Sequence, residues 1–377
     1  MSRQPLARAA LIVALVCASL VPPAERGAHA AEPIPNASLV NKGVVELETG
    51  GSSEIAARIA ADIVSVVDDG ATRRVVPIIG KGPLQNLTDL RFLRGIDVAI
   101  VQSDALDYAR DQRLVPGIES LTYIAKLYNE EFHLLARSNI KTITDLSNQT
   151  VNVDLRGSGT AMTASRLFDL LKITVTMTTD NQEVALQKLR KGEIAALALV
   201  AAKPAPLFRD LTASAGLHLL SIPLTPAVSG AYAPSRITAD DYPNLVAADQ
   251  PADSIAVGSL LMAADLRMIP ERYRNVVNFV EAFFAGSQSL LETGHHPKWQ
   301  EVDIAASVPG WVRYPPAEQW LQRNMQVATT PNPDAMKSLF SRFVDERRQT
   351  SGGAPMTAED KDALFQQFRA WQRGQTR

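Results

Sequence analysis

One pattern, repeated in the two halves of this 377-residue chain, most constrains how it can fold. In each half a short apolar run of β type leads into a loop of small residues, and that loop opens a helical run. The predicted strands are at 44–47 and 151–153, and the loops that follow them are at 50–53 and 156–160. Strands that alternate with helices are typical of parallel βαβ units. The sequence therefore predicts an α/β fold made of two related lobes.

Further predicted strands and helices continue this alternation and indicate where the domains begin and end. Strands are predicted at 75–79, 97–101, 132–136, 194–200 and 255–262, helices at 55–66, 167–171, 184–189 and 276–284, and a helical turn at 143–146. Residues 225–256 look irregular, and the run at 255–262 can return the chain to its first half. We therefore expect lobe 1 from 43–133 plus 257–330, lobe 2 from 134–256 and a C-terminal helical extension over 331–377.

The first 30 residues have the features of a secretory signal peptide. Arg3 and Arg8 precede an apolar run over 9–21, and Ala28-His29-Ala30 fits a small-x-small cleavage site. The apolar run is shorter than the ~20 residues that a membrane-spanning helix needs. The sequence therefore predicts export to a periplasm with cleavage near Ala30, followed by a linker over 31–42.

Cys17, the only cysteine, lies inside this apolar run. Lipid anchoring through Cys17 is an alternative, although Val16 stands where a lipoprotein signal has a small residue. After cleavage the chain would hold no thiol, which excludes disulfides, cysteine metal sites and a cysteine nucleophile. With 38 basic and 40 acidic residues, the charge balance gives no reason to expect a nucleic-acid partner. No enzyme motif is evident, so we expect no catalytic residue, metal or cofactor.

The loop over 156–160 carries the most chemistry. Gly157 and Gly159 let the backbone approach a ligand closely, and Ser158 and Thr160 add hydroxyl donors. The N-terminus of the helix that follows favours an anion. Arg156 has the geometry to bind a carboxylate through two parallel hydrogen bonds. The alternative is an ordinary strand-to-helix turn with Arg156 in solvent.

Two other loops stand at corresponding places in the first half. Gly50–Ser53 opens a helix, but Glu54 in its first turn would repel an anion, so we expect it to meet an uncharged part of a ligand. Gln102 and Ser103 follow another predicted strand and can both donate and accept hydrogen bonds. For both loops the alternative role is helix capping alone. Ligands of open parallel sheets collect at such strand ends.

Five segments in a fixed order resemble a known family. They are LETGGSS, DVAIVQSDA, LYNEEFHLLARSNIKTITDL, VNVDLRGSGTAMTASRLFDLL and LQKLRKGEIAALALVAAKPAP. Together they resemble the solute receptors of tripartite ATP-independent periplasmic (TRAP) transporters, specifically the TAXI subfamily, over roughly residues 43–325. The chain departs from that pattern at Glu54-Ile55-Ala56, where the family usually has an aromatic stretch, and its tail beyond about residue 330 has no counterpart.

The resemblance implies a type II periplasmic-binding-protein fold, with two α/β lobes around a central ligand cleft. It implies a monomeric receptor that closes on a small organic acid or amino acid and delivers it to a TRAP-type membrane permease. The ligand-binding residues carried over by position are Gly51, Ser52, Gln102, Ser103, Tyr128, Arg156, Gly157, Ser158, Gly159, Thr160 and Lys203. The rival interpretations are a periplasmic enzyme such as a hydrolase, and a sensory ligand-binding module.

Overall fold

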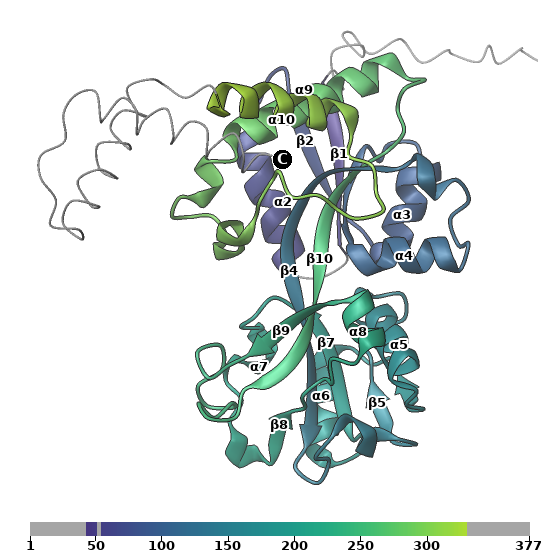
Figure 1. Ribbon diagram of the computed structural model, residues 1–377, viewed down its shortest axis with the longest axis vertical. Coiled ribbons are helices and arrows are strands. Elements are labelled where there is room, and N and C mark those ends of the chain that lie inside the picture. Colours follow the sequence, from purple (N-terminus) through teal and green to yellow (C-terminus); the bar gives the residue numbers. More distant parts are fainter. Residues whose placement is uncertain (1–42, 51–53, 330–377) are drawn as a thin grey trace, which may run out of the picture. The chain divides into compact units, whose positions relative to one another are not determined.

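The computed structural model of the protein describes residues 43–50 and 54–329 (Figure 1). The predicted signal peptide, the linker over 31–42, Gly51, Ser52 and the predicted C-terminal extension over 331–377 lie outside the described residues. The predicted limits of the two lobes also stay a prediction. We use them here as names, with lobe 1 meaning residues 43–133 and 257–329 and lobe 2 meaning residues 134–256.

The first half of the described chain alternates strands and helices until one long strand ends the series. In order, the elements are β1 (Val44–Thr49), α2 (Glu54–Val67), β2 (Arg74–Ile79), α3 (Pro83–Phe92), β3 (Val98–Gln102), α4 (Ser103–Asp111) and β4 (Thr122–Arg137). β1 pairs in parallel with both β2 and β3, as the alternation predicts.

The second half repeats the alternation and then returns to lobe 1. The elements that follow β4 are β5 (Thr150–Asn152), α5 (Gly159–Leu171), β6 (Thr176–Thr178), α6 (Gln182–Lys191), β7 (Ala196–Ala201), α7 (Pro206–Arg209), β8 (Leu217–Leu219), α8 (Pro226–Ala231), β9 (Ala233–Ile237), β10 (Ala252–Ala263), α9 (Pro270–Gly286) and α10 (Pro315–Thr329). β5 pairs in parallel with β6 and β7.

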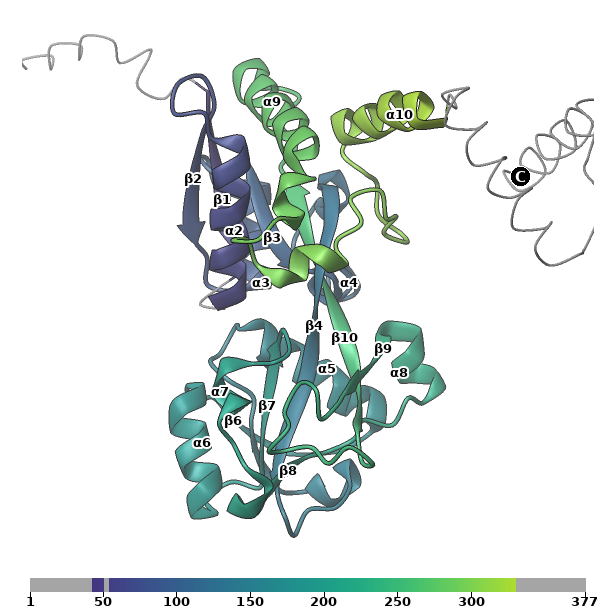
Figure 2. The ribbon, with the colours of Figure 1, turned by 90° about the vertical axis from the view of Figure 1, so that its left-hand side faces the viewer.

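Two long antiparallel strands join the lobes. β4 and β10 lie side by side and run from one lobe into the other (Figure 2). They make the sheet continuous, in the order β2-β1-β3-β10-β4-β7-β5-β6, with β8 on β4 and β9 on β10. Their register shifts between Gly258 and Leu260, near the middle of the crossing. This α/β arrangement of two lobes on a pair of crossing strands agrees with the predicted fold class.

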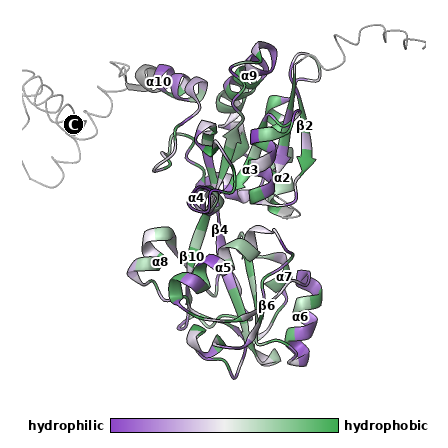
Figure 3. Ribbon diagram, turned by 90° about the vertical axis from the view of Figure 1, so that its right-hand side faces the viewer, coloured by the Kyte–Doolittle hydropathy of each residue, from purple (hydrophilic) through white to green (hydrophobic). Residues whose placement is uncertain are grey.

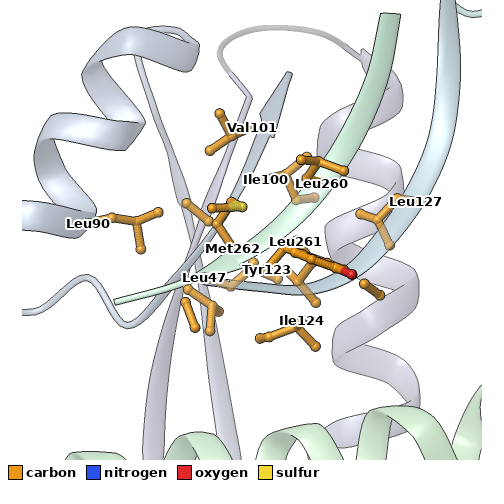
Figure 4. Close-up of a cluster of buried hydrophobic side chains, with 14 of the residues drawn as sticks. Leu47, Leu90, Ile100, Val101, Tyr123, Ile124, Leu127, Leu260, Leu261 and Met262 are labelled. Atoms are coloured by element: carbon orange, nitrogen blue, oxygen red, sulfur yellow. The ribbon is translucent and has the colours of Figure 1, made fainter. Parts of the chain in front are cut away.

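The described residues form three apolar clusters, one centred on lobe 1 and two centred on lobe 2. In lobe 1, α2 buries Ile59 and Ile63 against the sheet, as its helical spacing predicts. Figure 4 shows the centre of this cluster, where Leu47 of β1, Ile100 of β3 and Met262 of β10 lie close together. Hydropathy colouring shows hydrophobic residues within both lobes, whereas α4 and α6 carry hydrophilic residues (Figure 3).

Local chemistry explains where helices begin and end. Asn181 caps α6 by accepting a hydrogen bond of 2.9 Å from the Val184 amide, and Gly192 ends the helix at a φ of 79°. The predicted turn at 143–146 is confirmed as a 3-10 helix with a capping box between Thr142 and Asp145.

Seven of the helices and strands named above were not predicted from the sequence: α3, β6, α7, β8, α8, β9 and α10. Of these, α8 and β9 lie within residues 225–256, where irregular structure was expected. β9 begins with Ala-Pro-Ser, a composition with low strand propensity, and it pairs only through β10. α10 begins with Pro315 and Pro316, residues that suit the first turn of a helix but also mark loops. None of the helices in the described part of the chain has both the length and the apolar character that a membrane crossing requires.

Candidate ligand-binding site

A cavity of about 1050 Å³ has walls from both lobes. It lies where β1, β3, β5 and β7 end, which is the edge at which parallel sheets bind ligands. From lobe 1 it is lined by Gly50, Ile55, Ala56, Arg58, Lys81, Gly82, Pro83, Ile100, Gln102, Tyr128, Glu130, Ser259, His296, Pro297, Lys298 and Glu301. From lobe 2 it is lined by Asp154, Leu155, Ser158, Gly159, Thr160, Asn181, Gln182, Glu183, Leu199, Val200, Ala201, Ala202, Lys203, Pro204, Ala205, Pro206, Leu207 and Arg209.

Six of the residues predicted to bind a ligand line this cavity: Gln102, Tyr128, Ser158, Gly159, Thr160 and Lys203. Several also have structural roles. Ser158 Oγ accepts from the Ala161 amide at 3.1 Å and so caps α5. Thr160 Oγ1 accepts from the Val200 amide at 3.0 Å, and Lys203 Nζ donates to Asp241 at 3.1 Å. These bonds hold the loops in place at the cavity wall.

The other residues predicted to bind a ligand are not among those that line the cavity. Ser103 Oγ accepts from the Gly258 amide at 3.2 Å, beside the register shift of β10, and does not line the cavity. Arg156 is exposed, and neither it nor Gly157 is part of the lining. Gly51 and Ser52 lie outside the described residues. The ligand-binding role of all eleven residues stays a prediction.

The two lobes approach closely where Gln102 meets Gly159. A Cβ on Gly159 would overlap the amide of the Gln102 side chain, so a larger residue there would displace this side chain from its present position. Gly159 is also the first residue of α5, and its neighbours Ser158 and Thr160 line the cavity. The contact therefore brings the end of β3 against the start of α5.

Three helices begin at the cavity. The N-terminal residues of α3 (Gly82, Pro83), of α5 (Ser158, Gly159) and of α6 (Asn181 to Glu183) all line it. Each N-terminus carries a partial positive charge of about +0.5 and free amide donors. Lys81 and Arg209 add two positive charges to the lining, and Asp154 and Glu183 add two negative charges before α5 and in the first turn of α6. The starts of α3 and α5, which have no acidic residue in their first turns, are therefore best suited to an anion such as a carboxylate.

A polar wall crosses the middle of the site on three adjacent strands. We use this name for Gln102 of β3, Ser259 of β10, and Tyr128 and Glu130 of β4, all of which line the cavity. Ser259 is directly opposite Gln102 in the β3–β10 register. Glu130 accepts from Gln102 Nε2 and Ser259 Oγ, both at 3.4 Å. Burial raises the pKa of Glu130 to about 7, and it raises the pKa of Tyr128 well above its usual range.

Sequence reasoning did not select Glu130 or Ser259. The available signal was the pair Glu130-Glu131 inside an otherwise apolar strand, because charged residues are rarely buried unless they have a function or a partner. Ser259 has no local signal, since only strand pairing brings it to Gln102.

A comparison with known protein families matches residues 54–284 to the NMT1-like family, which is more than half of the chain. The chain belongs to the NMT1-like family.

Similar solved structures share little sequence with this NMT1-like protein. A TctC solute-binding protein from Polaromonas is 14% identical, with a TM-score of 0.42 over 68% of this chain and 86% of that one. The periplasmic binding protein BugD is 12% identical, with a TM-score of 0.42 over 68% and 85%. The periplasmic aliphatic sulphonate-binding protein SsuA from Escherichia coli is 16% identical, with a TM-score of 0.37 over 88% and 92%.

Buried ionic contacts flank the cavity of this NMT1-like chain. Lys298, which is 5% exposed, lies 3.4 Å from Glu131 Oε1 and 2.9 Å from Glu301 Oε2. The other carboxyl oxygen of Glu131 accepts from the Lys203 amide at 3.2 Å. Glu131 on β4 thus links the 3-10 helix Pro297–Glu301 of lobe 1 to the loop after β7 in lobe 2.

A second buried contact joins α4 to α5. Asp104 Oδ2 accepts from Thr163 Oγ1 at 2.7 Å and from the Tyr232 hydroxyl at 3.2 Å. Arg166 donates to the Asp104 backbone oxygen at 3.2 Å. Burial raises the pKa of Asp104 to about 6, although these contacts oppose the shift. Within residues 43–50 and 54–329, no cluster of three or more His, Cys, Asp or Glu side chains is arranged to hold a metal ion.

Proposed function

We propose that this NMT1-like protein is an exported solute-binding receptor that captures a small carboxylate-bearing solute, an organic acid or an amino acid, in the cavity between its lobes. The observation that carries the proposal is the meeting of three helix N-termini with Lys81 and Arg209 at one cavity. Together they supply the donors and positive charge that a carboxylate requires, without any group that must react with it.

Capture would depend on both lobes. The lining comes from strand ends of lobe 1 and loops of lobe 2, and the lobes are joined by β4 and β10. A solute that contacts both sets of residues has a higher affinity for the closed arrangement than for an open one, and it therefore favours closure.

The cellular part of the proposal follows from the sequence resemblance. We place the protein in a periplasm after cleavage near Ala30, as a monomeric receptor of the TAXI subfamily with a TRAP-type membrane permease as its partner. Mass spectrometry of the exported protein should find Ala31 at its N-terminus, and a lipidated Cys17 would contradict cleavage there. Detergent-solubilised permease subunits should be retained by the immobilised, solute-loaded receptor.

Isothermal titration calorimetry of the purified protein with a panel of dicarboxylates and amino acids tests the binding role. We expect one solute per chain, and a loss of about 1.5–3 kcal/mol of binding free energy in Lys81→Ala or Arg209→Ala, the scale of a hydrogen bond to a charged group. Lys191→Ala is the matched control, because Lys191 is exposed at the opposite end of α6. Absence of binding across the panel, or equal affinity in all three variants, would reject the proposed site.

A further inference from the structure

Glu130 is a buried carboxyl group in the cavity lining that has no cation in contact with it among the described residues. Its exposed fraction is 4%, and it forms no salt bridge in residues 43–50 and 54–329. Its two hydrogen bonds, from Gln102 and Ser259, are both long at 3.4 Å and both reach the same oxygen, Oε2. Buried charges in proteins are normally paired, because desolvation of an isolated ion costs several kcal/mol.

The side chain of Gln102, next to Glu130, also has an acceptor without a hydrogen-bond donor among the described residues. Gln102 Oε1 is buried and has no hydrogen-bond partner within the described chain, while the amide nitrogen of the same side chain donates to Glu130. Gln182, on the lobe 2 side of the lining, repeats the arrangement: its Nε2 donates to Ala198 and its Oε1 has no partner. A buried acceptor without a donor costs about 1–3 kcal/mol. Gln102 Oε1 packs against Gly159, so it would accept a hydrogen bond from a donor-bearing ligand only after its side chain turns toward the cavity, whereas Glu130 already lines the cavity.

We propose that Glu130, with Gln102 and Ser259, forms a subsite for a protonated nitrogen of the solute. The solute would then be zwitterionic, with its carboxylate at the helix N-termini and its ammonium group at the polar wall. This inference rests on the proposed function and narrows its ligand class to amine-bearing acids.

When no solute is bound, a proton on the Glu130 carboxyl group can neutralise its charge in place of the ammonium group. The pKa of Glu130 is raised to about 7, because burial and the nearby Glu131 raise it more than the hydrogen bonds from Gln102 and Ser259 and the charge of Lys298 lower it. Tyr128, the other titratable group of the polar wall, stays neutral at this pH because burial raises its pKa. An arriving ammonium group favours the carboxylate and displaces the proton. Binding near pH 7 should thus release a fraction of one proton per solute.

Calorimetry with matched pairs of probes tests this inference. Each pair consists of an amino acid and the same acid without its amine: glutamate with glutarate, leucine with 4-methylpentanoate, and 4-aminobutanoate with butanoate. The variant is Glu130→Gln, which keeps the volume and the hydrogen-bonding capacity of the side chain and removes its charge. Glu48→Gln is the matched control, because Glu48 is also 4% exposed, its pKa is also raised to about 7, and it lies outside the cavity lining.

We expect at least one amine-bearing probe to bind on the order of tenfold to a hundredfold more tightly than its amine-free partner, a preference that Glu130→Gln abolishes and Glu48→Gln keeps. Titrations in buffers of different ionisation enthalpy should show proton release for the wild-type protein and none for Glu130→Gln. Unchanged thermal unfolding would show that Glu130→Gln is folded.

Two results would overturn the inference, and they are distinguishable. If amine-free acids bind as tightly as their amine-bearing partners, or if Glu130→Gln keeps the preference, the subsite is wrong while the proposed receptor function stands. If no probe of either kind binds, the proposed function fails and the subsite fails with it.

Discussion

Gly82 of lobe 1 lies against Gly157 of lobe 2, with the two backbones so close that a Cβ at position 82 would overlap the Gly157 carbonyl oxygen. Gly82 also has a φ of 145°, a conformation that L residues other than glycine rarely adopt. Since Gly82 lines the cavity at the start of α3, this contact sets how closely the two lobes approach at the site.

Gly82→Ala should therefore push the lobes apart. A Cβ meets backbone atoms, which cannot rotate away as a side chain would. We expect a larger radius of gyration in small-angle scattering, weaker binding of any solute that bridges the lobes, and a loss of about 1–3 kcal/mol in the free energy of unfolding. The matched control is Gly95→Ala, because Gly95 also has a positive φ (106°) but no heavy atom within 4 Å of the added Cβ. Equal scattering curves for the two variants would show that the Gly82–Gly157 contact does not limit closure.

The parts of the site that could be predicted are those that depend only on the order of neighbouring elements in the sequence. Ser158 and Gly159 were placed at the cavity because a strand, a small-residue loop and a helix follow one another within a few residues. Arg156 belongs to the same loop but is exposed. Its direction depends on the backbone turn between Asp154, at a φ of 68°, and Gly157, at a φ of 86°. No spacing rule specifies such a turn.

The parts that could not be predicted depend on strand pairing across the whole chain. Glu130 and Ser259 are 129 residues apart, and they meet only because β10 pairs with β4 on one side and with β3 on the other. Lys298 reaches Glu131 across 167 residues because the 3-10 helix Pro297–Glu301 packs on β4. The fold class was predictable because the alternation of strands and helices can be recognised from neighbouring residues. The polar wall was not, because it forms only when strands far apart in the sequence pair.

The buried carboxyl group of Glu48 should make stability depend on pH. Burial raises its pKa from 4.5 to about 7, and repulsion from Asp89 adds to the shift. The folded protein thus holds a proton between pH 4.5 and 7 that the unfolded chain has lost. This contribution to stability is fully present below pH 4.5 and is lost as the pH rises through 7.

Glu48→Gln keeps the neutral form at every pH, so it should gain stability relative to the wild type by about 1–3 kcal/mol between pH 5 and pH 8. Urea denaturation at both pH values measures this difference. Glu130 and His133 titrate in both proteins, His133 with a pKa lowered to about 4 by burial, and their effects cancel in the comparison. Glu193→Gln, at an exposed position, should leave the difference near zero. Parallel pH curves for Glu48→Gln and the wild type would contradict the shifted pKa.

Breaking the Lys298–Glu131 pair should lower the free energy of unfolding much more than breaking an exposed ion pair. Both side chains are almost fully buried, at 6% and 5% exposure, so removing Lys298 leaves the Glu131 carboxylate desolvated and without a salt bridge to any described residue. We expect Lys298→Met to lower the free energy of unfolding by about 3–5 kcal/mol, and Glu131→Gln to restore much of this loss in the double variant. Lys188→Met removes the partly exposed pair with Asp180 and should cost less than about 1 kcal/mol. A double-mutant cycle by urea denaturation measures the coupling. A coupling energy close to zero would mean that Glu131 is neutralised without Lys298, and that the link between the 3-10 helix Pro297–Glu301 and the loop after β7 does not depend on that charge.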